Sequence, residues 1–278
     1  MYKIGLSSCS KPLNEKLFYD FANNGIGAME VSPRYHEIKD LDYRAIKDYA
    51  RQFNIDLWSF HLPFLPFSEV EMSALDASTR NYTLQYYGEL IKKASDIGID
   101  KFIVHPSGEP IDPAERKDRM AYSKESFDKL AEIAWKCGSV IAVEDLPRTC
   151  LGNCADEILE LISVNDKLRV CFDTNHLLTE DNADFIRRIG DKIITLHVSD
   201  YDRINERHWL PGEGVIDWAS VLKALEEIKY NGVWMYEISY ECPKTIARNR
   251  NLTCEDFSQN ARELFAGQKP TVFSSHIL

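Results

Sequence analysis

The chain has 278 residues, of which 44% are hydrophobic, so it is long enough to bury a large core in one α/β barrel or in two smaller domains. Its formal net charge of −11 opposes nonspecific attraction to nucleic acid and to anionic lipid. No apolar run approaches the ~20 residues of a membrane span, the N-terminus leads straight into strand-like sequence, and the seven cysteines are typical of reduced intracellular thiols. We therefore expect a cytoplasmic protein without a membrane or nucleic-acid partner.

Eight short runs of β-forming residues recur along the chain. They cover residues 3–8, 27–32, 56–63, 101–107, 140–147, 168–175, 193–200 and 233–239. The segments between them carry apolar residues at helical spacing, as at Leu84, Tyr87, Leu90, Ile91 and Ala94. Strands that alternate with helices predict a parallel sheet with right-handed crossovers, and eight such units at this length favour a single (β/α)8 TIM barrel of the α/β class.

An open doubly wound sheet is the alternative architecture, but no G-x-G-x-x-G motif follows the first predicted strand. No Ser/Gly-rich linker or composition shift divides the chain, so we expect residues 1–278 to form one domain. The longest interruptions, residues 64–74 and 201–214, would carry active-site loops in a barrel. Within the first of these, the apolar stretch Phe64-Leu65-Pro66-Phe67 predicts a wall or lid over a small ligand. The tail after Gly267 has few packing cues.

Acidic and imidazole side chains stand at the ends of almost all the predicted strands. They are Glu30, His61, His105, Glu144, Asp173, His197 and Glu237, with His176 three residues after Asp173. A barrel gathers its strand ends in one mouth, where burying several carboxylates and imidazoles is costly unless a cation neutralises them. Oxygen ligands together with imidazole suit Mn, Zn, Co, Fe or Mg, so the pattern predicts a divalent-metal site of open identity.

The same strand ends carry a resemblance, over nearly the whole chain, to the superfamily of xylose-isomerase-like barrels. That superfamily includes ketose 3-epimerases, inositol-pathway enzymes and endonuclease IV. The motifs are Val-Glu144-Asp, Phe-Asp173-Thr-Asn-His176, Leu-His197-Val-Ser-Asp, Tyr-Glu237-Ile and the stretch from His208 to Trp218. In the epimerase-like members the resemblance implies that Glu144, Asp173, His197 and Glu237 bind one metal. It also implies that His176 and Arg203 hold substrate oxygens.

What the resemblance implies is a metal-dependent isomerase or epimerase of a sugar, sugar phosphate or related polyol. The metal would bind two adjacent oxygens of an open-chain ketose, and Glu144 and Glu237 would be the catalytic pair that removes and returns a proton through an enediolate. An inosose-type dehydratase is a close variant of this chemistry. Cys150 stands where some such epimerases have a second carboxylate, which leaves the substrate open. No Lys/Arg cluster indicates a phosphate site, so an unphosphorylated substrate is favoured.

A second mapping comes from endonuclease IV, a metal-dependent phosphodiesterase with a three-metal site. Its ligands would correspond to His61, His105, Glu144, Asp173, His176, His197, Glu206, His208 and Glu237, with Glu206 where that family has Asp. The net charge of −11 and the lack of clustered basic residues in the strand-end loops count against this alternative, because duplex binding needs several phosphate contacts. A noncatalytic sugar-binding barrel is a third alternative.

The remaining candidates carry weaker signals. We expect His61, His105 and His208 to bind sugar hydroxyls or, together with Glu206 and His176, to hold additional metals. Lesser candidates for lining the pocket are Glu30, Trp58, Arg148 and Trp209. We interpret His36 and His276 as surface residues. The pattern is compatible with a homo-oligomer but does not predict one.

Overall fold

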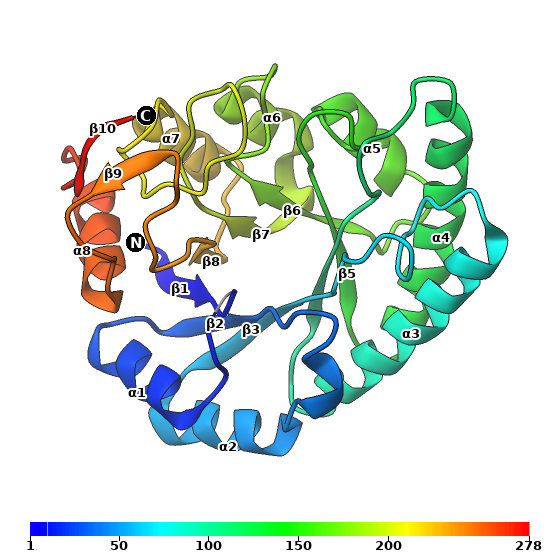
Figure 1. Cartoon of the computed structure of the whole chain (residues 1–278), viewed down its shortest axis with the longest axis horizontal. Helices are drawn as coiled ribbons and strands as arrows, with labels where there is room; N and C mark the ends of the chain where they lie inside the picture. The colour runs from blue at the N-terminus through cyan, green and yellow to red at the C-terminus, as the bar shows by residue number, and fades with distance from the viewer. Residues whose placement is uncertain (10, 278) are drawn as a thin grey trace.

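Eight parallel strands form a barrel in the computed structural model, which describes residues 1–9 and 11–277 (Figure 1). They are β1 (Lys3–Ser7), β2 (Ala28–Val31), β3 (Asp56–His61), β4 (Lys101–Val104), β5 (Val140–Glu144), β6 (Arg169–Asp173), β7 (Ile193–His197) and β8 (Val233–Tyr236). Their order in the sheet is β7-β6-β5-β4-β3-β2-β1-β8. The amide of Val198 donates to the carbonyl of Met235 at 2.8 Å and brings the two ends of this sheet together. The predicted (β/α)8 barrel is therefore confirmed.

Helices surround the strands (Figure 1). They are α1 (Glu15–Asn23), α2 (Tyr43–Phe53), α3 (Ala77–Ser95), α4 (Arg116–Lys136), α5 (Ala155–Ile162), α6 (Asn182–Ile189), α7 (Trp218–Glu227) and α8 (Cys254–Phe265), with short 3-10 helices η1 (Ile38–Asp40) and η2 (Gly190–Lys192). A side-chain cap starts several of them; at α3 the Asp76 carboxylate accepts the amide of Thr79 at 2.8 Å. The apolar residues that recur at helical spacing in α3 are buried, which fixes the face that packs on the barrel.

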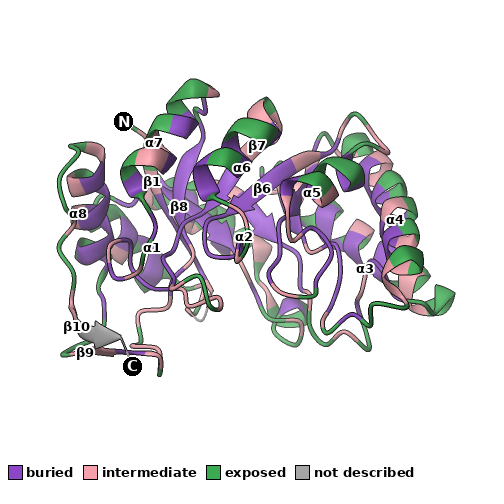
Figure 2. Cartoon of the chain, turned by 90° about the horizontal axis from the view of Figure 1, so that it is seen from above, coloured by how far each residue is buried: buried purple, intermediate pink, exposed green. Residues whose placement is uncertain are grey.

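Buried residues concentrate in the strands and on the inner faces of the helices, and exposed residues cover the outer helix faces (Figure 2). The strands are shorter than the predicted runs at their carboxyl ends. β5, for example, ends at Glu144, and the following Leu146 and Pro147 leave the parallel ladder and line the barrel mouth. The ends of the runs therefore supply the walls of the mouth, where a barrel carries its functional residues.

A two-stranded antiparallel sheet of β9 (Ile246–Arg248) and β10 (Ser274–Ile277), which the sequence did not predict, lies near α8 (Figure 1). Arg248 pairs with Glu213 at 2.6 Å, and this buried ion pair joins β9 to the loop after β7. His276 is part of β10, and its side chain lies outside the described residues. In the described part of the chain, no helix combines the length and the apolar character that crossing a membrane requires.

Candidate metal centre

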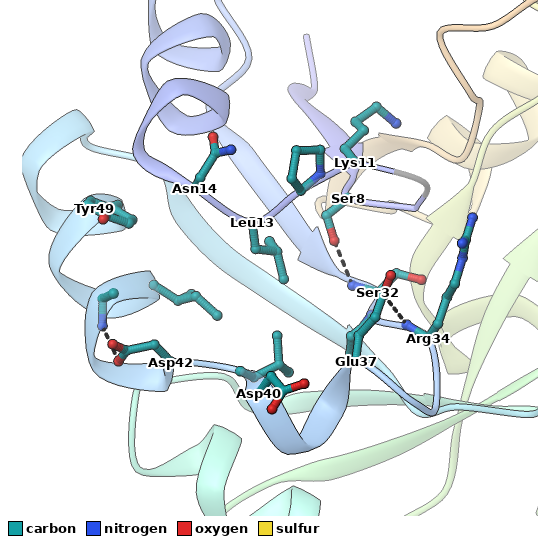
Figure 3. Close-up of a pocket in the computed structure, with 15 residues that line it drawn as sticks. Ser8, Lys11, Leu13, Asn14, Ser32, Arg34, Glu37, Asp40, Asp42 and Tyr49 are labelled. Atoms are coloured by element: carbon teal, nitrogen blue, oxygen red, sulfur yellow. Dashed lines mark hydrogen bonds between the residues drawn. The ribbon is translucent and has the colours of Figure 1, made fainter.

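The cavity beside the carboxyl ends of β1 and β2 does not hold the predicted site. This cavity of about 660 Å³ lies between α1 and α2 (Figure 3). Its polar side chains serve local structure: Ser8 accepts the amide of Ser32 at 2.8 Å, and Asp42 accepts the amide of Ala45 at 2.9 Å at the start of α2. Among the described residues that line it, none is a strand-end acid or imidazole that the sequence singled out.

A smaller cavity, of about 150 Å³, lies in the mouth of the barrel. The predicted site residues that line it come from six different βα units. They are His61, His105, Glu144, His176, Glu206, His208 and Glu237. Because the strands are parallel, their carboxyl ends meet at one face of the barrel and bring residues far apart in sequence into one cavity.

Glu144, the last residue of β5, contacts imidazoles from three other strand ends. Its Oε2 lies 3.1 Å from the Nε2 atoms of both His61 and His105, and its Oε1 lies 2.8 Å from Nδ1 of His197. Burial favours the neutral acid, but His197 and His105 outweigh that effect and hold the pKa of Glu144 well below its usual value. Glu144 is therefore an ionised carboxylate at the centre of an imidazole cluster.

Glu144, Asp173, His197 and Glu237 form a group in which four ligand atoms, one from each residue, lie within 4.8 Å of one another. Nδ1 of His197 is 3.9 Å from Oδ2 of Asp173 and 3.4 Å from Oε2 of Glu237. Oδ2 of Asp173 is buried without a hydrogen-bond partner among the described residues, and burial raises the pKa of Asp173 to about 6. Three carboxylates and an imidazole this close together fit a bound divalent cation.

Glu30, on β2, contacts the other side of the His197 ring. Its Oε2 lies 3.0 Å from Nε2 of His197 and accepts the hydroxyl of Ser59 at 2.8 Å. When Nε2 of His197 donates its proton to Glu30, Nδ1 is left to face the group of four, as is usual for metal-binding histidines. The sequence placed Glu30 only among the lesser pocket-lining candidates; in the structure it is fully buried behind a predicted ligand.

Further groups of three potential ligands adjoin the group of four. Among them are His61, His105 and Glu144, and His176, Glu206 and His208. Nδ1 of His176 donates to the carbonyl of Asp145 at 2.7 Å, and its Nε2 lies 3.4 Å from Oε2 of Glu206. Burial opposes ionisation of Glu206, but the contact with His176 lowers the pKa of Glu206 to about 2. The nine residues of the endonuclease IV mapping thus gather in one barrel mouth.

Arg203, which the resemblance implies holds substrate oxygens, does not line this cavity. Its Nη2 donates to Oδ2 of Asp181 at 3.0 Å, and its side chain lines a separate cavity between α6 and α7. The backbone of Arg203 is left-handed, at φ 61°. Spacing from His197 alone does not reveal where the side chain of such a loop residue points.

Arg148, one of the lesser candidates, brings a guanidinium to the cavity instead. Its Nε donates to Oε2 of Glu109 at 2.8 Å, and its Nη2 donates to Oε1 of Glu206 at 3.1 Å. The backbone of Arg148 has φ 55°, a left-handed conformation that is uncommon outside glycine, asparagine and aspartate. Arg148 therefore holds Glu206 beside His176.

Phe64 and Cys150 also line the cavity. The ring of Phe64 stacks on the imidazole of His105, with ring centroids 4.1 Å apart and 16° between the planes. Phe64 therefore forms one wall of the cavity, and its place on the apolar stretch after β3 was the signal in the sequence.

Three other candidates lie away from the cavity. Nε1 of Trp58 donates to the hydroxyl of Thr195 at 3.1 Å, and Nε1 of Trp209 donates to that of Thr245 at 3.0 Å. Neither tryptophan lines the cavity, although Trp209 ties the loop after β7 to the segment after β8. His36 is exposed, in agreement with its interpretation as a surface residue.

Known proteins with similar sequences and structures indicate the family of this chain. The model of the xylose isomerase-like TIM barrel family matches residues 18–257. The chain is 29% identical over 177 residues to an uncharacterised protein of Methanocaldococcus jannaschii, a match that covers 60% of each. It is 28% identical over 213 residues to the D-psicose 3-epimerase of Ruminiclostridium cellulolyticum, a match that covers 71% of this chain and 69% of that protein.

A solved structure shares the whole fold. The crystal structure of a D-tagatose 3-epimerase-like protein superposes with a TM-score of 0.80 at 22% identity, covering 95% of this chain and 97% of that one. A similarity at 22% identity establishes the barrel fold alone. The chemistry has to be inferred from the residues in the barrel mouth.

Proposed function

Because the chain belongs to the xylose isomerase-like TIM barrel family, we propose that it is a divalent-metal-dependent isomerase or epimerase of a sugar or related polyol. One observation carries the proposal: Glu144, Asp173, His197 and Glu237 offer ligand atoms within 4.8 Å of one another, and two of these carboxylates line a cavity. The matched D-psicose 3-epimerase supports the same class of reaction.

The donor set suits Mn, Zn, Co, Fe or Mg. Glu144, Asp173, His197 and Glu237 would hold the ion, and the partnerless buried oxygen of Asp173 is the clearest sign of a ligand to be bound there. When bound, such an ion would polarise the carbonyl and a neighbouring hydroxyl of an open-chain sugar and stabilise the negative charge that develops on them.

Glu237 is the carboxylate better placed to take a proton from carbon. Its side chain is 15% exposed, whereas that of Glu144 is 1% exposed and held by three imidazoles. A general base must reach the proton that it removes, so we assign proton removal to Glu237 and proton return to Glu144. Burial opposes protonation of His61, but Glu144 outweighs that effect and raises the pKa of His61 to about 9, so His61, with Nε2 3.1 Å from Glu144, can pass it a proton.

The imidazoles around the cavity are suited to bind sugar hydroxyls. Because Nδ1 of His176 is engaged by the carbonyl of Asp145, its Nε2 is the atom left for a ligand. We keep His61, His105 and His208 as substrate contacts, since all three line the cavity. We assign to Arg148 the substrate-facing position that the resemblance implies for Arg203.

Deuterium exchange tests the proposed reaction. The metal-loaded protein is incubated in D₂O with a panel of ketoses that includes D-psicose, and NMR follows the C–H signals beside the carbonyl. An epimerase exchanges the proton on C3 of a ketose, and an aldose–ketose isomerase exchanges one on C1. A dehydratase of the inosose type instead releases water, which mass spectrometry detects in the product.

Glu237→Gln is the matched control, because it keeps the shape of the side chain and removes the base. We expect weakened metal binding and no detectable exchange, with an unchanged circular dichroism spectrum. Exchange at the wild-type rate in this variant would remove Glu237 from the mechanism. Exchange that persists after metal removal would contradict metal dependence.

A metal-dependent phosphodiesterase is the second candidate, favoured by the additional groups of three ligands. Three clustered ions would activate a hydroxide and hold a phosphodiester oxygen. The net charge of −11 opposes it. Elemental analysis separates the two: about one tightly bound ion per chain supports the isomerase or epimerase, whereas two or three would make nicking of abasic DNA the next assay.

A further inference from the structure

An apolar groove of about 650 Å³ opens beside the cavity of the metal centre. Its walls come from the loop between β2 and η1 and from the loop after β3. The apolar residues that line it are Pro33, Tyr35, Pro63, Phe64, Leu65 and Pro66. Leu65 is 50% exposed at its edge, so part of this apolar surface faces solvent in the protein alone.

The groove adjoins the site. Phe64 and Glu237 line both the groove and the 150 Å³ cavity. Phe64, which stacks on His105, stands between the two spaces as a shared wall, and Glu237 is the proposed base. A ligand whose reacting carbon lies beside Glu237 can therefore extend into the groove.

The cavity at the metal centre is smaller than the groove beside it. Ligand pockets of proteins usually measure about 300–1,000 Å³. The cavity at the metal centre, at about 150 Å³, falls below that range, and the groove, at about 650 Å³, falls within it. The complete binding site is therefore larger than the part that holds the reacting atoms.

Ser32, Arg34, His36 and Glu237 are the polar side chains of the groove, but its apolar walls suit a flat ring better than a second polyol chain. Proline has no backbone N–H, so Pro33, Pro63 and Pro66 offer no main-chain donor to a hydroxyl. Burying hydroxyls without hydrogen bonds is costly, whereas a flat apolar ring stacks well on aromatic and proline faces. Tyr35 and Phe64 supply such faces.

We propose that this groove is a second subsite that takes an apolar, ring-sized substituent carried by the sugar. The substrate class is then a substituted open-chain sugar, with its carbonyl end at the metal centre and its substituent in the groove. This inference rests on the proposed function for the identity of the sugar end, and for the rest on Glu237 facing both spaces.

Tyr35 is a preformed part of the groove wall. Its hydroxyl lies 3.0 Å from the hydroxyl of Tyr82, and its ring lies 5.4 Å from the ring of Tyr86, both on α3. Two independent contacts thus fix the ring before a ligand arrives. Tyr35→Ala removes the whole ring, whereas Tyr35→Phe removes only the hydroxyl, so the two substitutions form a matched pair.

The test compares D-fructose with 6-O-benzyl-D-fructose, whose substituent lies at the end of the chain away from the carbonyl. Calorimetry on the metal-loaded protein measures both affinities, and deuterium exchange measures turnover of both. We expect the benzyl ether to bind at least about tenfold more tightly, a difference of about 1.4 kcal/mol. Tyr35→Ala should bring the ratio of the two affinities close to one, whereas Tyr35→Phe should keep it.

Each outcome separates the groove from the reaction. Equal affinities in the wild type would overturn the groove, and exchange in D-fructose would then still support the proposed function. Tighter binding of the benzyl ether, lost in Tyr35→Ala, without exchange in either sugar would support the groove and reject the reaction. If neither sugar bound, both proposals would fall.

Discussion

The imidazole of His197 is held from two sides by carboxylates of different roles. Glu144 and Glu237 lie near its Nδ1, and Glu30 lies at its Nε2. Glu30 belongs to a strand 167 positions earlier in the chain and does not line the cavity. Its effect on a bound metal would therefore act only through the orientation and basicity of His197.

Glu30→Gln should lower the affinity for the divalent metal by about 10- to 100-fold, the usual cost of losing a partner behind a metal-binding histidine. The variant keeps the shape of the side chain but weakens its hold on the Nε2 proton of His197. Metal titration by calorimetry measures the change. Glu89→Gln, an exposed position on α3, is the control and should bind as the wild type does. Unchanged affinity in Glu30→Gln would show that His197 needs no carboxylate behind it.

His176→Ala should reduce substrate affinity or turnover more than metal content. Its Nε2 lies 3.7 Å from Oδ2 of Asp173 and 3.4 Å from Glu206, at the border between the group of four and the cavity. In the isomerase or epimerase proposal it contacts the substrate, so the variant should keep its single ion. The loss of one metal equivalent, measured by elemental analysis, would instead support a multi-metal phosphodiesterase.

The strand-end residues could be predicted because each stands at the close of a β-forming run, and a barrel brings such positions together whatever their separation in sequence. Arg148 and Arg203 show the limit of this reasoning. Both lie in loops and both have left-handed backbones, at φ 55° and 61°. One points into the cavity and the other toward Asp181, and only the packed loop decides between these directions.

At the scale of elements, the strands and their order followed from the alternation of β-forming and helical runs, whereas the contacts that anchor the long loops did not. The loop after β7 carries Glu206 and His208, and the buried pair of Glu213 and Arg248 fastens it to β9. A three-residue strand whose partner begins 26 positions later has no local signal, so β9 could not be predicted from periodicity.

Glu213→Gln should lower the free energy of unfolding by about 3–5 kcal/mol, because it leaves the buried guanidinium of Arg248 without its charge partner. Both side chains of this pair are 0% exposed. Glu227→Gln is the matched control, since it breaks an ion pair with Arg187 whose side chains are about 40% exposed, and it should cost at most about 1 kcal/mol. Urea unfolding measures both, and equal losses in the two variants would show that the Glu213 pair is no anchor.

At the scale of the whole molecule, the charged residues gathered in the barrel mouth for function lower the stability of the folded protein. Folding buries the carboxylate of Asp173 inside the group of four, and in the absence of a cation the cost of burying its charge opposes the folded state. A ligand that binds only the folded chain stabilises it, by about 2.7 kcal/mol at a concentration 100 times its Kd. Metal binding and thermal stability are therefore coupled in this protein.

Asp173→Asn distinguishes the stability of the metal-free protein from the stability gained on metal binding. It removes one buried negative charge and keeps the shape of the side chain. Without metal, the variant should be as stable as the wild type or more stable, since burial already disfavours the ionised form of Asp173. With metal added, the wild type should gain in melting temperature and the variant should gain much less, because one ligand oxygen of the group has lost its charge. Calorimetric melting in chelator and in excess Mn or Zn measures both changes. If metal raised the two melting temperatures equally, Asp173 would not be a ligand, and the ion would have to bind at one of the neighbouring groups of three.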